Sequence, residues 1–213
     1  MVDKNIYWKG AAIALILFLI SVSIGYYLES IKYKQMTNEI NALNLEIDSS
    51  STMLLFVQTI GYNKSNCKTV TSALEPMSIQ VSQLREKLER GKSNIFINYN
   101  NLRSLYYLTN LKLFLLTNEN NLFCHNKKNT ILFFYNADNV CPSCVVQGKI
   151  LNDIKKDFKE ELYIFAFPYD IENPAALNML KAYYTIKSAP SVVINGEILN
   201  GLQSEKKIRQ KLK

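Results

Sequence analysis

The pattern of hydrophobic and polar positions divides the chain into zones of different periodicity. Residues 10–28 are predominantly apolar and contain no charged side chain. Over 29–127 the apolar positions recur at helical spacing, whereas from residue 128 onward continuous apolar runs alternate with amphipathic stretches. The pattern therefore predicts a short tail over 1–9, an apolar helix over 10–28, a helical segment over 29–127 and an α/β domain over 128–213.

The apolar segment predicts a single transmembrane helix. About 20 apolar residues span the hydrocarbon core of a bilayer, and Trp8, Tyr26 and Tyr27 flank the run where interfacial aromatic residues are found. A cleaved signal peptide is the alternative, because Lys4 and Lys9 precede the run and small residues lie near its end. We predict the uncleaved anchor, since the run is long for a signal peptide and the following segment continues as a helix.

The helical segment is predicted to contain three helices joined by short turns, which makes consecutive helices antiparallel neighbours. The apolar stripes lie at Met36, Ile40, Leu43, Ile47, Leu54 and Val57, at Leu74, Met77, Val81, Leu84 and Leu88, and at Tyr99, Leu102, Tyr106, Leu113 and Leu116. We interpret these stripes as the core of a helical stalk, with a parallel coiled-coil dimer of the first helix as an alternative. The second helix is expected to begin close to Pro76 and to end at Gly91.

Antiparallel packing places two of the four cysteines at the same end of this stalk. Cys67 follows the first predicted helix and Cys124 follows the third, so we predict a structural disulfide between them. Two separate buried thiols are the alternative, because cysteine is commonly buried for packing alone. A disulfide favours an oxidising compartment. Together with the anchor, it predicts a single-pass cell-membrane protein with a cytoplasmic N-terminus and an extracytoplasmic C-terminal domain.

The last zone predicts the element order β-α-β-α-β-β-α. Buried strands are expected over 130–135, 162–167 and 191–194, helices over 142–158, 174–184 and 204–212, and a hairpin strand over 197–199. Asn195-Gly196 is the strongest short signal for the hairpin turn. Ser204 is a plausible N-cap of the last helix.

The run Cys141-Pro142-Ser143-Cys144 lies between the first of these strands and the first of these helices. Backbone N–H groups at a helix N-terminus stabilise a thiolate, so the pKa of Cys141 is expected to lie below the ~8.5 of a free thiol. Two intervening residues place the second sulfur one turn further on, and Pro142 suits the first helical turn. The spacing predicts a redox centre with Cys141 as the exposed nucleophile and Cys144 as the buried resolving thiol, tuned by Pro142 and Ser143.

The succession of strand, CPSC, helix, strand, helix and then Ser188-Ala189-Pro190-Ser191 before a hairpin resembles the thioredoxin superfamily over about residues 128–213. The resemblance implies an α/β thioredoxin-like fold and thiol–disulfide exchange. In that family the proline that opens the third core strand is cis and faces the redox pair, a place that Pro190 occupies here. The resemblance further implies that Ala189 and Pro190 shape a substrate groove, in which the Ala189 backbone pairs with an extended substrate segment.

Several features depart from that family. The domain begins at the CPSC strand, without the additional N-terminal strand and helix, and the third stalk helix is expected to cover that side. Val140 stands where thioredoxins have Trp, and Pro142-Ser143 replaces Gly-Pro. Phe134 is taken to replace the buried acid that helps to deprotonate the resolving thiol. These changes put a thioredoxin-like reducing strength in question.

Two other functions fit parts of the sequence. A zinc site would use Cys141 and Cys144 with Cys124 and His125, although His125 is the only histidine and adjoins Cys124 directly. The second alternative is a non-catalytic interaction protein, because a thioredoxin-like fold can serve as a scaffold and does not by itself establish an enzymatic function. The net charge of +7 is spread over lysines scattered among Asn and Glu, which argues against a nucleic-acid groove.

The sequence therefore predicts a membrane-anchored thiol–disulfide oxidoreductase that needs no cofactor or metal. Its expected partners are proteins with thiols or disulfides, a second redox protein that exchanges electrons with the CPSC pair, and the membrane. The direction of electron flow depends on the redox potential, which the sequence does not reveal.

Overall fold

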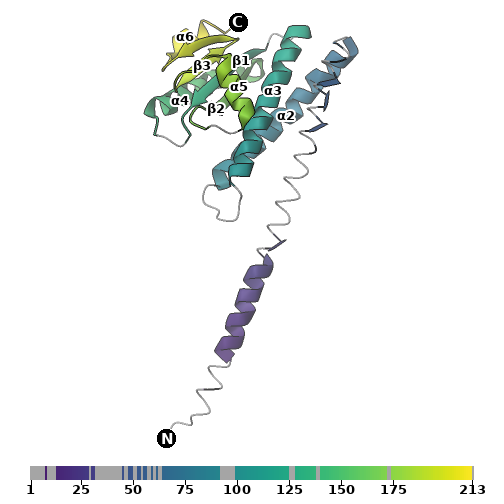
Figure 1. The fold of residues 1–213 in the computed structure, drawn as a ribbon, viewed down its shortest axis with the longest axis vertical. Helices are drawn as coiled ribbons and strands as arrows, with labels where there is room; N and C mark the ends of the chain where they lie inside the picture. The colour runs from purple at the N-terminus through teal and green to yellow at the C-terminus, as the bar shows by residue number, and fades with distance from the viewer. Residues whose placement is uncertain are drawn as a thin grey trace. The chain divides into compact units, whose positions relative to one another are not determined.

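The computed structural model describes residues 8, 13–28, 30–31, 61, 64–91, 99–124, 128–137, 140–171 and 174–212, with single positions between 45 and 59 (Figure 1). The chain divides into two compact units, Met1–Glu46 and Ile47–Lys213.

The predicted transmembrane anchor over 10–28 is wrong. The described residues 13–28 of the first unit are helical. No helix in the described part of the chain is both long enough and apolar enough to cross a membrane. The predicted single-pass localisation, with its cytoplasmic and extracytoplasmic sides, rested on this anchor and is corrected with it.

Two long helices open the described part of the second unit, α2 (Lys64–Gly91) and α3 (Tyr99–Phe123). They pack along each other through the predicted stripes, whose residues Leu74, Met77, Leu84, Leu88, Leu102, Tyr106, Leu113 and Leu116 are all buried. α3 also contacts the sheet, so the pair belongs to the same compact unit as the α/β part. The first predicted stalk helix, with its proposed coiled coil, lies almost entirely outside the described residues.

Pro76 lies inside α2 and not near its beginning, which corrects the predicted start of this helix. A proline within a helix removes one backbone hydrogen bond and crowds the preceding turn, at a cost of about 3 kcal/mol. The turns before Pro76 contain Val70 and Leu74, which are buried at 0% and 3% exposure. Burial of these side chains, together with a disulfide in the first turn, offsets the unfavourable proline.

The α/β part has the element order that the sequence predicted. It runs β1 (Asn129–Tyr135), α4 (Pro142–Phe158), a 3-10 turn η1 (Lys159–Glu161), β2 (Leu162–Pro168), α5 (Ala175–Tyr183), β3 (Ser191–Ile194), β4 (Glu197–Asn200) and α6 (Glu205–Arg209). The sheet order is β2-β1-β3-β4. β1 pairs with β2 in parallel, and the other two pairs are antiparallel. The whole chain is therefore a mixed α/β protein without the anchor that the predicted fold class included.

The central strand β1 is buried on both faces of the sheet. Ile131 and Phe133 share a buried cluster with residues of α4, including Leu151 and Ile154. On the opposite face Phe134 lies 6.0 Å from Phe167, measured between ring centroids. This alternation follows from the period of two along a strand, and it decides which β1 side chains can reach the start of α4.

α3 lies beside β2, the strand at the sheet edge (Figure 1). The Asn110 side-chain amide donates to the carbonyl of Ala166 at 3.1 Å, and Phe114 meets Phe165 with ring centroids 5.5 Å apart. Thioredoxins have an additional N-terminal strand and helix, which the described residues of this domain lack. α3 lies on the β2 side of the domain, where the third stalk helix was expected to take their place.

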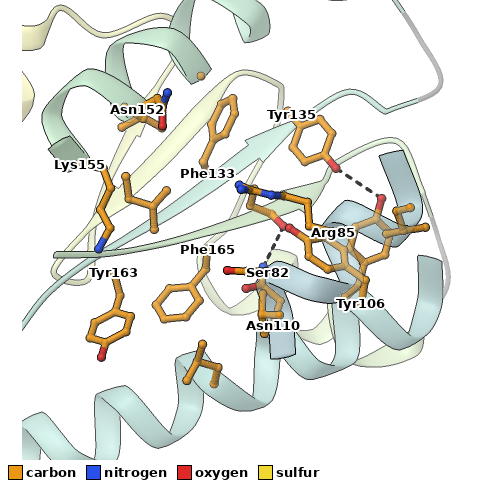
Figure 2. Close-up of a pocket in the computed structure, with 18 of the residues that line it drawn as sticks. Ser82, Arg85, Tyr106, Asn110, Phe133, Tyr135, Asn152, Lys155, Tyr163 and Phe165 are labelled. Atoms are coloured by element: carbon orange, nitrogen blue, oxygen red, sulfur yellow. Dashed lines mark hydrogen bonds between the residues drawn. The ribbon is translucent and has the colours of Figure 1, made fainter. Parts of the chain in front are cut away.

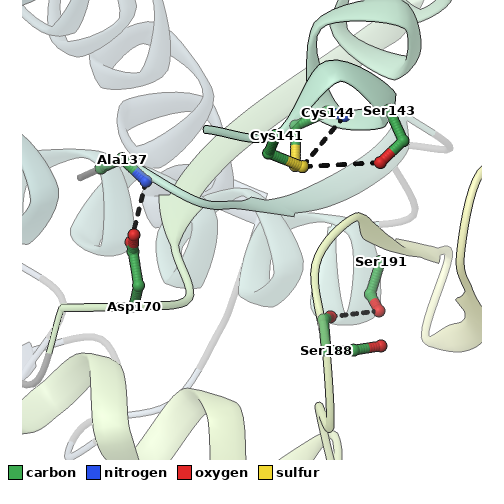
Figure 3. Close-up of a disulfide and its surroundings, with 7 residues drawn as sticks. All are labelled: Ala137, Cys141, Ser143, Cys144, Asp170, Ser188 and Ser191. Carbon is green, nitrogen blue, oxygen red and sulfur yellow. Dashed lines mark hydrogen bonds between the residues drawn. A yellow bond between two sulfur atoms is a disulfide. The ribbon is translucent and has the colours of Figure 1, made fainter. Parts of the chain in front are cut away.

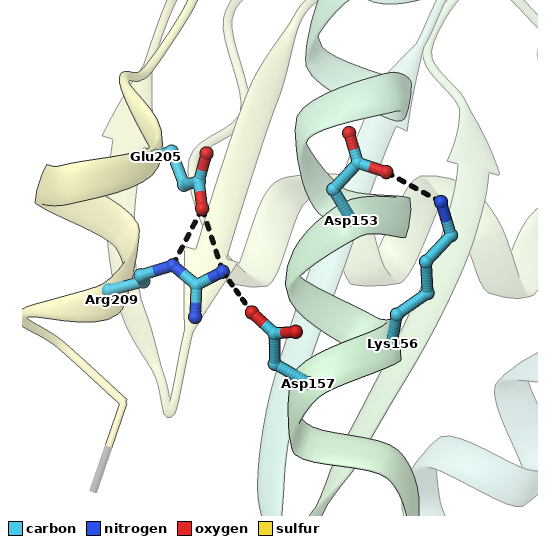
Figure 4. A network of polar contacts seen from close by, with 5 residues as sticks. All are labelled: Asp153, Lys156, Asp157, Glu205 and Arg209. Carbon is cyan, nitrogen blue, oxygen red and sulfur yellow. Dashed lines mark hydrogen bonds and ion pairs between the residues drawn. The ribbon is translucent and has the colours of Figure 1, made fainter.

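The C-terminal hairpin and helix match their sequence signals. Asn195 and Gly196 form the turn with φ values of 49° and 92°, the left-handed conformations that this type of hairpin requires. Ser204 caps α6 by accepting the Lys207 N–H. In Figure 4, Arg209 bridges Glu205 of its own helix and Asp157 of α4. Because exposed ion pairs contribute at most about 1 kcal/mol, the buried Ile208 anchors α6 more than this network does.

Cys67 and Cys124 form a disulfide, the pairing that the sequence predicted. Cys67 lies in the first turn of α2 and Cys124 directly follows α3, and their Cα atoms are 5.6 Å apart. Because α2 and α3 are antiparallel, the bridge joins the two helices at one end of the pair.

Replacing Cys67 and Cys124 together with serine is expected to destabilise the protein. The two residues are separated by 57 positions, and closing a loop of that length in the unfolded chain corresponds to about 4 kcal/mol of stability. Urea denaturation followed by circular dichroism would measure the loss. The matched control is the Cys141→Ser/Cys144→Ser variant, whose bridge spans a separation of 3. Equal losses in the two variants would contradict the prediction.

Candidate active site

The two cysteines of the CPSC run form a disulfide at the N-terminus of α4 (Figure 3). Cys141 is the N-cap residue, Pro142 occupies the first turn, and Cys144 begins the buried side of the helix. Cys144 is 6% exposed, whereas Cys141 is partly accessible. Cys141 lies at the end of the loop that follows β1, whereas Cys144 lies on the buried side of the helix.

The sulfur of Cys141 lies at the N-terminus of α4, beside the backbone N–H groups of the first turn. The Cys144 N–H donates to Cys141 Sγ at 3.2 Å, and Ser143 Oγ lies 3.5 Å from the same sulfur (Figure 3). When the pair is reduced, a donor in this position favours the thiolate over the thiol, and the helix dipole acts in the same direction. Of the two predicted tuning residues, Ser143 thus lies beside the first sulfur, and Pro142 occupies the first turn of α4.

The peptide bond between Ala189 and Pro190 is cis, which confirms what the family resemblance implied. Ala189 and Cys141 pack against the same buried cluster that contains Cys144. The loop is fixed at both ends: Ser191 Oγ donates to the Ser188 carbonyl at 2.7 Å (Figure 3), and the Gly201 N–H donates to the Pro190 carbonyl at 2.8 Å. The structure therefore places Ala189 of the predicted groove against the same buried cluster as the redox pair.

Phe134 was the wrong residue to compare with the missing buried acid. It lies on the sheet face opposite α4, beside Phe167. The residue of β1 that shares the buried cluster of Cys144 is Phe133, with Tyr135 packed against the same cluster. Neither Phe133 nor Tyr135 carries a carboxylate, so the buried acid predicted to be missing is not supplied by β1. Among the described residues, no carboxylate bonds to either cysteine.

A carboxylate does hold the loop that leads to the redox pair. The N–H of Ala137 donates to Asp170 Oδ1 at 2.8 Å, which ties the segment after β1 to the segment after β2 (Figure 3). Asp170 thus accepts a backbone hydrogen bond in the loop before Cys141, without contacting the sulfurs.

Gln147 is a site residue that the sequence analysis missed. It is fully buried in α4, one turn after Cys144, and its Oε1 accepts the N–H of Gln203 at 2.7 Å. The Gln203 side chain donates in turn to the carbonyls of Asn200 and Gly201. Since Gly201 also bonds to Pro190, this chain of contacts connects the redox helix to the proline loop. A polar residue at a core position of an amphipathic helix was the available signal.

The zinc alternative finds no support in the described residues. They contain no group of three or more His, Cys, Asp or Glu side chains that could hold a metal ion. Cys124, Cys141 and Cys144 are all disulfide-bonded and so offer no thiolate ligand in this state. His125, the remaining predicted ligand, lies outside the described residues.

Comparisons with known proteins find solved structures that are similar to part of this chain. No protein-family model matches the chain, and no curated protein matches it. Among solved structures, the thioredoxin-like protein BC3987 is 30% identical with a TM-score of 0.29, over 38% of this chain and 99% of that chain. Chloroplastic thioredoxin z is 16% identical with a TM-score of 0.33, over 45% of this chain and 85% of that chain. The thioredoxin-like fold of the C-terminal part follows from its own strand pairing and cis-proline.

Replacing Gln147 with leucine is expected to lower the free energy of unfolding by about 1–3 kcal/mol, because the buried N–H of Gln203 loses its acceptor. The control is Gln83→Leu in α2, where the side chain is exposed and the change should stay within about 0.5 kcal/mol. Urea denaturation of the oxidised proteins measures both. Equal stability of the two variants would show that the contact contributes nothing.

Proposed function

We propose that this chain is a thiol–disulfide oxidoreductase that acts on protein disulfides or dithiols through Cys141 and Cys144. One observation carries the proposal: the Cys141 sulfur caps α4 and accepts the Cys144 N–H at 3.2 Å. A sulfur in that position is activated as a thiolate and, in the disulfide, is the more accessible of the two to attack. A cysteine pair that forms a disulfide within a thioredoxin-like fold already indicates a redox-related function.

The proposed reaction transfers two electrons between sulfur pairs. In the reducing direction the Cys141 thiolate attacks one sulfur of the substrate disulfide, a mixed disulfide forms, and the other substrate sulfur leaves as a thiolate and takes up a proton. Cys144, once deprotonated, attacks Cys141 Sγ, closes the Cys141–Cys144 bond and releases the second substrate thiol. In the oxidising direction the same steps run in reverse.

The surroundings of Cys144 suggest that the second step is the slower one. Cys144 is 6% exposed and lies in an apolar cluster with Phe133, and apolar burial raises the pKa of a thiol. No described carboxylate bonds to it, so its proton would pass to water or to the leaving thiolate. The mixed disulfide should therefore persist longer near neutral pH than at alkaline pH.

The surface around the redox pair supports a protein substrate. Val140 and Val145 are 94% and 75% exposed, and Pro142 is exposed between them. Exposed apolar side chains next to a reactive group are typical of a surface that contacts another protein. Interaction with a second redox protein, which restores the starting state of the pair, belongs to the same proposal.

Reduction of insulin disulfides by the full chain with dithiothreitol tests the proposal. Cys141→Ser should abolish turnover above the reagent background, whereas Cys144→Ser should accumulate a mixed disulfide that is visible on a non-reducing gel. The matched control is the Cys67→Ser/Cys124→Ser variant, which retains the CPSC pair. No turnover above the Cys141→Ser variant would overturn the enzyme proposal and leave a non-catalytic interaction protein.

A glutathione equilibrium of the CPSC pair would determine the direction of electron flow. A potential near about −270 mV is expected for a reductant and one near about −120 mV for an oxidant. Mass spectrometry after alkylation reports the reduced fraction of Cys141 and Cys144 directly.

A further inference from the structure

A groove of about 1540 Å³ lies between the α2–α3 pair and the sheet, next to α4 (Figure 2). Its walls come from both helices, from α4 and from the ends of β1 and β2, and its lining is rich in aromatic side chains, including Tyr106, Phe133, Tyr135, Tyr163 and Phe165. The volume exceeds the 300–1,000 Å³ typical of small-molecule sites. The space is therefore better matched to a segment of polypeptide.

The groove runs along β2, the strand at the edge of the sheet. β2 is the outermost strand, and four of its consecutive residues, 163–166, line the groove. The carbonyls of Leu162 and Ala166 point away from β1, because the side chains of Lys155 and Asn110 donate to them. Backbone groups alternate in direction along a strand, so Ile164 presents its N–H and carbonyl to the same side. An extended peptide is the ligand that such an edge can pair with.

The positive charge of the groove lining favours acidic peptides over basic ones. The described residues of its lining include the cationic side chains of Arg85, Arg103, Lys149 and Lys155 and one anionic side chain, Glu89, which pairs with Arg85. Their charges sum to +3. Burial raises the pKa of Tyr106 to about 12, so this hydroxyl stays neutral and does not reduce the positive charge. Clefts with one sign of charge attract ligands of the opposite sign.

The groove also lies close to the redox pair. Ala137 lines it and precedes Cys141 by four residues, so their Cα atoms are at most about 14 Å apart. Phe133 belongs both to the groove and to the buried cluster of Cys144. A polypeptide held in the groove would therefore be within a few residues' reach of Cys141.

We propose that this groove binds an extended, acidic segment of the protein whose disulfide or dithiol reacts at Cys141, with backbone pairing at Ile164. The inference rests on the proposed function, since it names the class of substrate for the same redox pair. It adds a recognition site on the sheet edge, separate from the surface around Pro190.

Fluorescence anisotropy of the oxidised full chain tests binding without any redox step. The probe is a labelled peptide of alternating glutamate and valine, and Arg85→Glu/Lys149→Glu should weaken its binding on the order of tenfold. The matched control is Lys206→Glu/Lys207→Glu on α6, which changes the net charge equally on exposed residues outside the groove lining. Equal weakening in the two variants would overturn the proposal.

A second probe separates backbone pairing from simple charge attraction. The same peptide with N-methyl groups on alternate residues cannot donate to the edge strand, and its affinity should fall on the order of tenfold. Equal affinity of the methylated and unmethylated peptides, or of a free polycarboxylate such as citrate, would show that only anions are attracted and would overturn the proposal.

Kinetics distinguish failure of the groove from failure of the enzyme. With a disulfide peptide flanked by the acidic sequence, Arg85→Glu/Lys149→Glu should raise KM on the order of tenfold and leave kcat unchanged. With a small aromatic disulfide that does not reach the groove, both parameters should match those of the unmodified protein. Loss of activity toward both substrates, with peptide binding intact, would instead contradict the proposed function.

Discussion

The burial of β1 on both faces is the constraint on which the rest of this structure depends. Ile131, Leu132 and Phe134 are each at most 1% exposed, so helices must cover the sheet above and below. α4 covers the face of Ile131 and Phe133, while aromatic residues of β2 and α3 fill the other. Because β1 is flanked by β2 and β3, its end also sets where the chain leaves the core, and Cys141 follows within one short loop.

The chemistry of the cysteine pair follows from this placement. The helix that covers β1 starts after the loop that follows the strand, and its Cys144 N–H donates to the first sulfur. The second cysteine lies in the apolar cluster with Phe133. One thiol is therefore favoured as an anion and the other as a neutral group. The loop of Pro190 reaches the same cluster, and Gln147 connects it to α4 through Gln203 and Gly201.

The same sheet has an edge at β2, and the helical pair is arranged around it. Side chains of α3 and α4 satisfy the carbonyls of Ala166 and Leu162 in place of a further strand. A helix beside a strand edge fills the space less completely than a strand would, and the aromatic groove between α2–α3 and α4 is the result. The disulfide of Cys67 and Cys124 holds the two helices together at one end.

The sequence by itself determined the local features of this protein: the strands and helices of the α/β part, the Asn195-Gly196 turn, the Ser204 cap, the CPSC pair and the pairing of Cys67 with Cys124. Each depends on residues close in sequence or on simple antiparallel geometry. Only the tertiary structure decided that Phe133 and not Phe134 faces Cys144, that α2 continues through Pro76, and that Gln147 joins two loops. Among the described residues it contains no helix that is both long enough and apolar enough to cross a membrane. These outcomes depend on which face of an element is covered and on how far a helix extends, and packing between distant segments decides both.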